Sequence, residues 1–161
     1  MASAQKVSTC LWFDAQAEEA ARFYVSLLPN SRVTAISRYG KNARMPEGLA
    51  LTVTFELAGT GLMALNGGPH FKLTEAASLV VQCESQAEID RLWSALLADG
   101  GKEQQCGWLK DRYGLSWQIV PAALPAMMQD ADPERSERVM AMVMGMVKPD
   151  IAALEAAYRG N

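Results

Sequence analysis

Histidine, cysteine and clustered basic residues are scarce in this chain, and their scarcity narrows the chemistry. The 161 residues contain one histidine, His70, and three cysteines, Cys10, Cys83 and Cys106. No CxxC pair occurs, and no cysteine lies at metal-site spacing from the histidine. The net charge of −3 and the lack of a basic cluster argue against a nucleic acid or an anionic membrane as partner.

Long apolar runs are missing as well. The first residues, Met1 to Lys6, lack the apolar segment of a signal peptide, and no run is long enough to span a membrane. Hydrophobic residues make up 50% of the chain, which is enough for a core without disulfides or metals. We therefore expect a soluble cytoplasmic protein with reduced thiols.

Motifs for the common nucleotide cofactors are also absent. The first predicted strand, Val7 to Phe13, leads into Asp14-Ala15-Gln16, and no glycine occurs before Gly40. A Rossmann-type methyltransferase would place a glycine-rich turn at this point. Phosphate-binding Gly-Lys-Ser/Thr loops and nucleophile elbows are not found either. The sequence predicts no cofactor.

Alternating polarity dominates the first half of the chain. In the stretch 51–57, four apolar side chains share one face of a strand and Thr52, Thr54 and Glu56 share the other. Further strands are predicted at 7–13, 32–39 and 62–66. A helix with Asp14 as its N-cap is predicted to run to Leu28, where Pro29-Asn30 ends the apolar pattern.

The same order of elements then recurs. A strand at 78–83, a helix carrying Ile89, Leu92 and Trp93, and strands at 103–106, 108–112 and 115–120 follow. An offset of 70 residues aligns Gln16-Ala17-Glu18 with Gln86-Ala87-Glu88 and pairs Ser8 with Ser78. We predict an α+β fold of two tandem βαβββ modules, at 7–68 and 77–121, within one domain, 1–161.

Methionine-rich helices are predicted in the tail, 122–161, at Leu124 to Met128 and Asp132 to Val147. A final helix is expected from Pro149 to Tyr158. The second of these carries a methionine stripe that includes Met140 and Met144. The stripe favours packing in the core or in a dimer over a promiscuous binding groove.

Several motifs together resemble a known superfamily. They are Trp12-Phe13-Asp14, Phe23-Tyr24, Asn66-Gly67-Gly68-Pro69 and the segment CGWLKDRYGLSWQIVP at 106–121. The chain is similar to the vicinal oxygen chelate superfamily from about Val7 to Tyr158, and more narrowly to its PhnB-like branch. That branch often carries the label 3-demethylubiquinone-9 3-methyltransferase. The resemblance implies cupped mixed sheets that enclose a pocket, C-terminal helices, and commonly a homodimer.

The resemblance also implies where a divalent metal would be bound. In the metal enzymes of the superfamily the first and fourth strands of each module supply the ligands. The equivalent positions here are Ser8, Ala64, Ser78 and Gln118. Hydroxyls are weak neutral donors and no carboxylate offsets the charge of the ion. We therefore expect no metal.

Two sets of candidate site residues follow. Under the resemblance, Asn66, Ser78 and Gln118 orient a small-molecule ligand, while Trp12, Phe23 and Trp108 form apolar walls. His70 and Cys106 are the candidates for a catalytic base or nucleophile, with Cys83 as another thiol, although a surface histidine and structural thiols are the favoured interpretations. Lys110-Asp111 is interpreted as an exposed ion pair.

The leading hypothesis is a metal-independent, homodimeric small-molecule-binding protein. Alternatives are a lyase or isomerase of the superfamily, the methyltransferase that the label implies, and an interaction module that uses the methionine-rich helices. Whether the protein is an enzyme stays open at this point.

Overall fold

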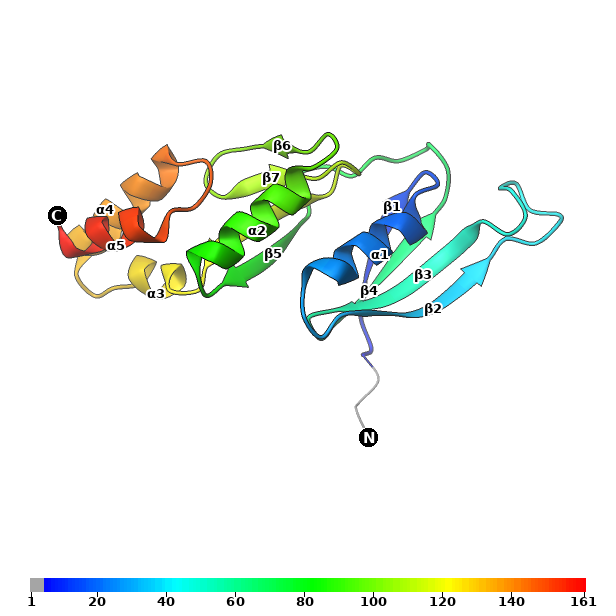
Figure 1. Cartoon of the computed structure of the whole chain (residues 1–161), viewed down its shortest axis with the longest axis horizontal. Helices are drawn as coiled ribbons and strands as arrows, with labels where there is room; N and C mark the ends of the chain where they lie inside the picture. Colours follow the sequence, from blue (N-terminus) through cyan, green and yellow to red (C-terminus); the bar gives the residue numbers. More distant parts are fainter. Residues whose placement is uncertain (1–4) are drawn as a thin grey trace. The chain divides into compact units, whose positions relative to one another are not determined.

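The predicted strands of the first half form one four-stranded mixed sheet. Its order is β1 (Thr9–Phe13), β4 (Thr60–Asn66), β3 (Ala50–Leu57) and β2 (Arg32–Arg38). The β1–β4 pair is parallel and the other two pairs are antiparallel. The computed structural model describes residues 5–161. The chain divides into two compact units, with the boundary between Leu73 and Thr74 (Figure 1).

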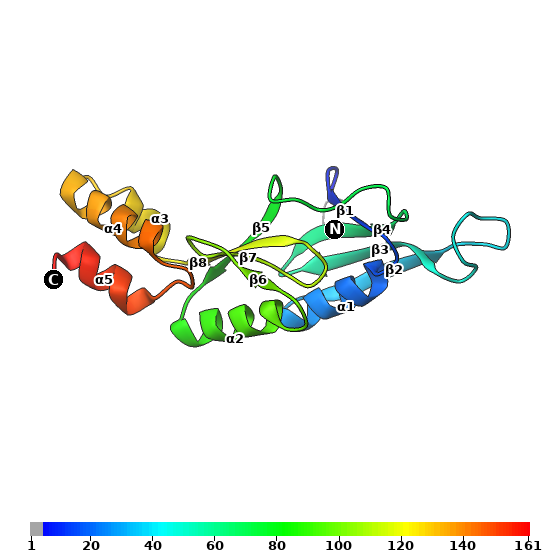
Figure 2. The ribbon, with the colours of Figure 1, turned by 90° about the horizontal axis from the view of Figure 1, so that it is seen from above.

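Helix α1 (Ala17–Leu27) packs on one face of this sheet and closes the core of the first unit (Figure 2). Its buried residues recur at helical spacing, and small side chains let the helix approach the strands closely. They are Ala17, Ala20, Ala21, Tyr24 and Leu27. Val53 and Phe55 of β3 are also buried, while Thr52 and Thr54 alternate with them. The predicted alternation of this strand is therefore confirmed.

The start of α1 differs from the prediction. Asp14 is not the N-cap, because the helix begins at Ala17 after Gln16, whose side chain makes no capping hydrogen bond. The first backbone N–H, that of Ala17, instead donates to Oδ1 of Asn66 at 2.8 Å. An N-terminal N–H has no partner within its own helix, so a residue from the end of β4 caps this one.

The second unit repeats the first. Its sheet has the order β5 (Ser78–Cys83), β8 (Ser116–Pro121), β7 (Trp108–Lys110) and β6 (Lys102–Glu103). Again the first and fourth strands are parallel and the other pairs antiparallel. The two sheets share one topology, so the predicted α+β fold with two βαβββ modules is confirmed. The second and third strands of the first module, β2 and β3, are longer than their counterparts β6 and β7.

Helix α2 (Gln86–Leu97) covers one face of the second sheet, as α1 covers the first (Figure 2). Ser85 is its N-cap and accepts a hydrogen bond from the N–H of Glu88. Ile89, Leu92 and Trp93 point to β7 and β8 and are buried. This local cap followed by apolar spacing is the ordinary sequence signature of a helix, and it gave the correct prediction.

Three further helices complete the second unit: α3 (Leu124–Met128), α4 (Pro133–Gly145) and α5 (Ile151–Arg159). Asp132 and Asp150 cap α4 and α5, and Gly160 ends α5 with φ of 83°. Three methionines of α4, Met140, Met142 and Met144, are 46%, 37% and 62% exposed. Within the predicted stripe Val139 is buried, whereas core packing does not account for Met140 and Met144, for which dimer packing stays a prediction.

None of the helices within residues 5–161 is both long and apolar enough to cross a lipid bilayer.

Candidate functional site

The face of the second sheet that α2 leaves uncovered is the candidate site, and we call it the open face of β5–β8. Leu109, Trp117 and Ile119 point to the helix side and are buried. Because side chains alternate along a strand, their neighbours point the other way. The open face therefore carries Ser78, Val80, Gln82, Trp108, Lys110, Ser116, Gln118 and Val120.

Strand register arranges these residues in rows across β5, β8 and β7. One row consists of Val80, Gln118 and Trp108, since Gln118 pairs with both of the others. Nε2 of Gln118 donates to Oγ of Ser78 at 2.9 Å. The structure thus brings together three of the predicted ligand-binding residues, Ser78, Gln118 and Trp108, all of them half-buried.

The adjacent row consists of Ser78, Ser116 and Lys110. Nζ of Lys110 forms an ion pair of 2.6 Å with Glu75, which also accepts from Nε2 of Gln104 at 3.0 Å. Together with a hydrogen bond from its own backbone, these contacts, led by that of Lys110, lower the pKa of Glu75 to about 2. Ser116 is fully buried, and its Oγ has no hydrogen-bond partner within the part of the chain that the structure describes.

The predicted exposed ion pair between Lys110 and Asp111 is wrong, because Asp111 is buried. It is 3% exposed, and its Oδ1 accepts from the N–H groups of Tyr113 and Leu115 at 2.9 and 3.0 Å. Its Oδ2 accepts from Nε1 of Trp117 at 2.9 Å. Asp111 therefore holds the β7–β8 hairpin together from inside, while Lys110 faces Glu75 instead.

The first sheet has its own open face, on which Trp12 lies. The indole of Trp12 covers Gly67, where an added Cβ would lie 2.2 Å from a ring carbon. Its Nε1 donates to the carbonyl of Gly68 at 2.9 Å. The exposed ring of Phe71 meets it edge-on with centroids 4.9 Å apart. The two glycines of the Asn-Gly-Gly motif thus form the surface on which this tryptophan packs.

Two other predicted ligand-binding residues of the first unit lie elsewhere. Asn66 is fully buried, with Oδ1 bound to the N–H of Ala17 and Nδ2 donating to the carbonyl of Ala50 at 2.9 Å. Phe23 lies on α1, the helix that packs on the opposite face of the sheet. The structure therefore does not bring Asn66 or Phe23 to the open face, and Asn66 has a structural role.

The expected metal-ligand positions need one correction. Cys10 pairs with Met63 in the first sheet, as Val80 pairs with Gln118 in the second, and an offset of 70 aligns Cys10 with Val80. The counterpart of Gln118 is therefore Met63, because Ala64 is buried on the helix side.

With this correction the strand positions supply two hydroxyls, one thioether and one amide, which do not fit a divalent cation. Moreover, no group of three or more His, Cys, Asp or Glu side chains suited to a metal occurs in residues 5–161.

The candidate catalytic residues His70 and Cys106 belong to different units of the chain. His70 is exposed in the loop after β4 in the first unit. Cys106 has φ of 61° and lines a small apolar cavity of about 20 Å³ with Leu124, Met146 and other residues. Burial raises the pKa of the Cys83 thiol to about 11, so this cysteine is protonated at neutral pH.

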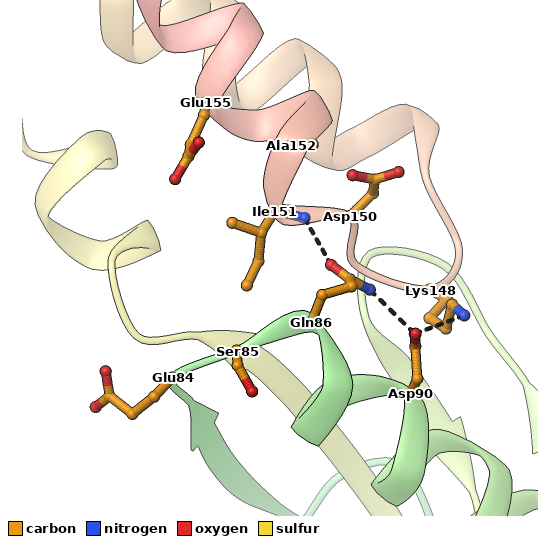
Figure 3. A pocket seen from close by; sticks show the side chains of 9 residues that line it. All are labelled: Glu84, Ser85, Gln86, Asp90, Lys148, Asp150, Ile151, Ala152 and Glu155. Atoms are coloured by element: carbon orange, nitrogen blue, oxygen red, sulfur yellow. Dashed lines mark hydrogen bonds and ion pairs between the residues drawn. The ribbon is translucent and has the colours of Figure 1, made fainter.

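A larger cavity, of about 580 Å³, lies where α2 and α5 begin (Figure 3). Gln86 bridges the two segments, since its Oε1 accepts from the N–H of Ile151 and its Nε2 donates to Asp90 and to the carbonyl of Pro149. Lys148 pairs with Asp90 at 2.7 Å and, followed by Gln86, lowers its pKa. Sequence reasoning noticed Gln86 only as part of the repeat. No predicted ligand-binding residue lines this cavity.

Residues 5–120 match the family model described as 3-demethylubiquinone-9 3-methyltransferase. The match ends before the C-terminal helices, so the resemblance inferred for 122–161 is not confirmed. None of the curated proteins compared with the chain matches it.

Solved structures agree with the family match. A PhnB protein from Bacillus cereus, which carries the same methyltransferase label, is 38% identical with a TM-score of 0.68, covering 73% of this chain and 100% of that one. Protein PA1353 from Pseudomonas aeruginosa is 22% identical with a TM-score of 0.61, covering 73% and 98%.

The fold also matches FosX, a fosfomycin resistance protein from Listeria monocytogenes. It is 14% identical with a TM-score of 0.56, and the match covers 81% of this chain and 100% of FosX. The chain therefore belongs to the PhnB-like family described as 3-demethylubiquinone-9 3-methyltransferase, within the vicinal oxygen chelate superfamily.

Proposed function

We propose that this protein binds a small organic molecule on the open face of β5–β8 without a divalent metal. The observation that carries the proposal is the polar group formed by Ser78 and Gln118 next to Trp108. Binding sites combine an apolar or aromatic wall with a few fixed polar groups. Here the amide oxygen of Gln118 and the hydroxyl of Ser78 are the orienting groups, and the indole is the wall.

The donor chemistry supports binding without a metal. Within the second module the first and fourth strands present a serine and a glutamine, both neutral. A bound cation would gain no charge compensation from them, whereas a polar organic ligand can accept and donate hydrogen bonds with both.

Methyl transfer is not part of the proposal, although the family label names it. Each sheet is four-stranded and mixed, and α1 follows β1 without a glycine-rich turn. Within residues 5–161 these features leave no dinucleotide-type crevice at the end of a parallel sheet.

A screen of a fragment library, in which binding is followed in ¹⁵N–¹H correlation spectra of the protein, tests the proposal. We expect fragments that shift the Trp108 indole and Gln118 side-chain signals, and loss of these shifts in Gln118→Leu. Gln82→Leu is the matched control, since Gln82 lies on the same face and is exposed. Metal content is measured on the same protein, purified without chelators. One tightly held ion per chain, or fragments that never reach these signals, would refute the proposal.

The resemblance also leads us to propose a homodimer, with the exposed methionines of α4 as its contact surface. Met140 and Met144 are large apolar side chains at 46% and 62% exposure, and Met142 of the same helix lines a groove of about 480 Å³ between α4 and α5. Sedimentation velocity should show a dimer that Met140→Glu with Met144→Glu converts to a monomer. A monomeric wild-type protein would contradict this.

A further inference from the structure

Each side chain in the row formed by Ser78, Ser116 and Lys110 can donate a hydrogen bond. Neighbouring residues on paired strands have Cβ atoms about 5 Å apart, so the side chains of Ser78, Ser116 and Lys110 start side by side on three strands. The Ser78 oxygen already accepts from Gln118, which leaves its own proton to be donated. Such a set of donors matches the oxygens of an anion.

Ser116 is the second observation that points to a ligand at this row. Its side chain is fully buried and its Oγ is the buried side-chain polar atom left without a hydrogen bond among residues 5–161. Buried polar groups in folded proteins are normally paired, because an unpaired one costs free energy. An oxygen acceptor placed between Ser78 and Lys110 would satisfy it.

An anion already stands at one end of the row. The carboxylate of Glu75 lies 2.6 Å from Nζ of Lys110, on the segment that leads into β5. Its side chain is 49% exposed, while that of Lys110 is 28% exposed and set by the register of β7. The carboxylate is therefore the more exposed partner of the pair, and the ammonium is the less exposed one.

We propose that the ligand of the open face is an organic anion, and that its carboxylate or phosphate group displaces Glu75 from Lys110. The displacing oxygens accept hydrogen bonds from Ser116 and Ser78, and the body of the ligand lies along the next row, against Trp108. In the protein without ligand, Glu75 therefore forms the ion pair with Lys110 that the anion of the ligand forms in the complex. This inference rests on the proposed function, because it names the class of ligand for the same face.

The test compares three probes that share a phenyl ring: benzoate, phenyl phosphate and the neutral benzamide, which is isosteric with benzoate. Binding is followed by the Trp108 indole signal in ¹⁵N–¹H spectra of the full chain. We expect benzoate or phenyl phosphate to bind at least tenfold more tightly than benzamide, and the better of the two anions identifies the group. Glu75→Gln should tighten the anion by roughly two- to tenfold, because it removes a competing ion pair.

Lys110→Gln and Ser116→Ala should each weaken the anion and leave benzamide unchanged. The matched control is the pair Lys148 and Asp90, which forms a similar ion pair of 2.7 Å in the same unit. Asp90→Asn and Lys148→Gln should change neither probe. Circular dichroism confirms that each variant is folded.

The outcomes separate the two claims. If benzamide and benzoate shift Trp108 equally and Glu75→Gln changes neither, the anion inference is overturned while small-molecule binding stands. If the whole fragment library, neutral and charged, leaves the signals of Trp108 and Gln118 unmoved, the proposed function fails and this inference fails with it. Anion binding that Asp90→Asn alters as strongly as Glu75→Gln would show a general charge effect and also overturn the inference.

Discussion

Replacing Asn66 by alanine tests whether this residue supports the fold or serves a ligand. Its side chain makes two hydrogen bonds inside the first unit, to the N–H of Ala17 at 2.8 Å and to the carbonyl of Ala50 at 2.9 Å. Both of these residues are at most 1% exposed. Asn66→Ala therefore leaves one buried donor and one buried acceptor without partners.

The magnitude follows from these two groups. An unsatisfied buried polar group costs about 1–3 kcal/mol, so for two groups we expect the free energy of unfolding to fall by about 2–6 kcal/mol. Domains are stable by only about 5–15 kcal/mol, so this loss is large. Urea unfolding followed by circular dichroism measures it. Hydrogen exchange of the Ala17 amide localises it, because that proton loses its acceptor.

Asn42→Ala is the control, since Asn42 is exposed in the 40–48 loop. We expect it to change the free energy of unfolding by less than about 0.5 kcal/mol. A loss below about 0.5 kcal/mol in Asn66→Ala, with the Ala17 amide still protected, would refute the structural role. In that case Asn66 would again be a candidate ligand-binding residue.

Three further substitutions or reactions probe the same contacts. Gly67→Ala should destabilise the first unit by about 1–3 kcal/mol and move the Trp12 indole signal, because the new methyl group would lie 2.2 Å from the ring; an unchanged urea midpoint would contradict this. Asp111→Asn should cost about 2–4 kcal/mol in urea unfolding, because the amide cannot accept the indole hydrogen bond without turning a backbone contact away; a loss under 0.5 kcal/mol would count against a hairpin clasp. Iodoacetamide at about pH 8 should modify the exposed Cys10 and spare Cys83, whose pKa of about 11 leaves roughly a thousandth as thiolate, with peptide mass spectrometry as the readout; equal labelling in the folded protein would disprove the assigned burial.

Local patterns explain what could be predicted from the sequence. The alternation in 51–57 and the helical spacing around Ile89 and Trp93 depend on neighbours a few residues away, and both correspond to elements of the structure. The internal repeat predicts in addition that the strands of both modules pair in the same way, since two copies of one element order have a common topology. Within the site, Ser78, Gln118 and Trp108 lie on neighbouring strands, and it was the family resemblance, not the local pattern, that put Ser78 and Gln118 forward.

Distant contacts explain what could not be predicted. Asn66 binds a residue 49 positions away, and nothing near it in the sequence shows that partner. Asp111 was different, because an acid two residues before a turn residue is an Asx-turn signal that the sequence did contain. The indole partner of Asp111 could not be inferred, since it depends on both side chains pointing to the same side of the hairpin.

The two modules cap their helices in different ways, and this difference accounts for the structural role of Asn66. In the second module Ser85 caps α2 locally. An offset of 70 aligns Ser85 with Ala15, which has no side-chain acceptor, so α1 must find its cap elsewhere. Asn66 pairs with Phe13 as Pro121 pairs with Cys83, which makes Pro121 its counterpart. The proline has no side-chain amide, and α2 needs none. Each module therefore has one residue that caps its helix. In the first module this residue is Asn66 at the end of β4, whose side chain accepts the hydrogen bond from the N–H of Ala17 in α1.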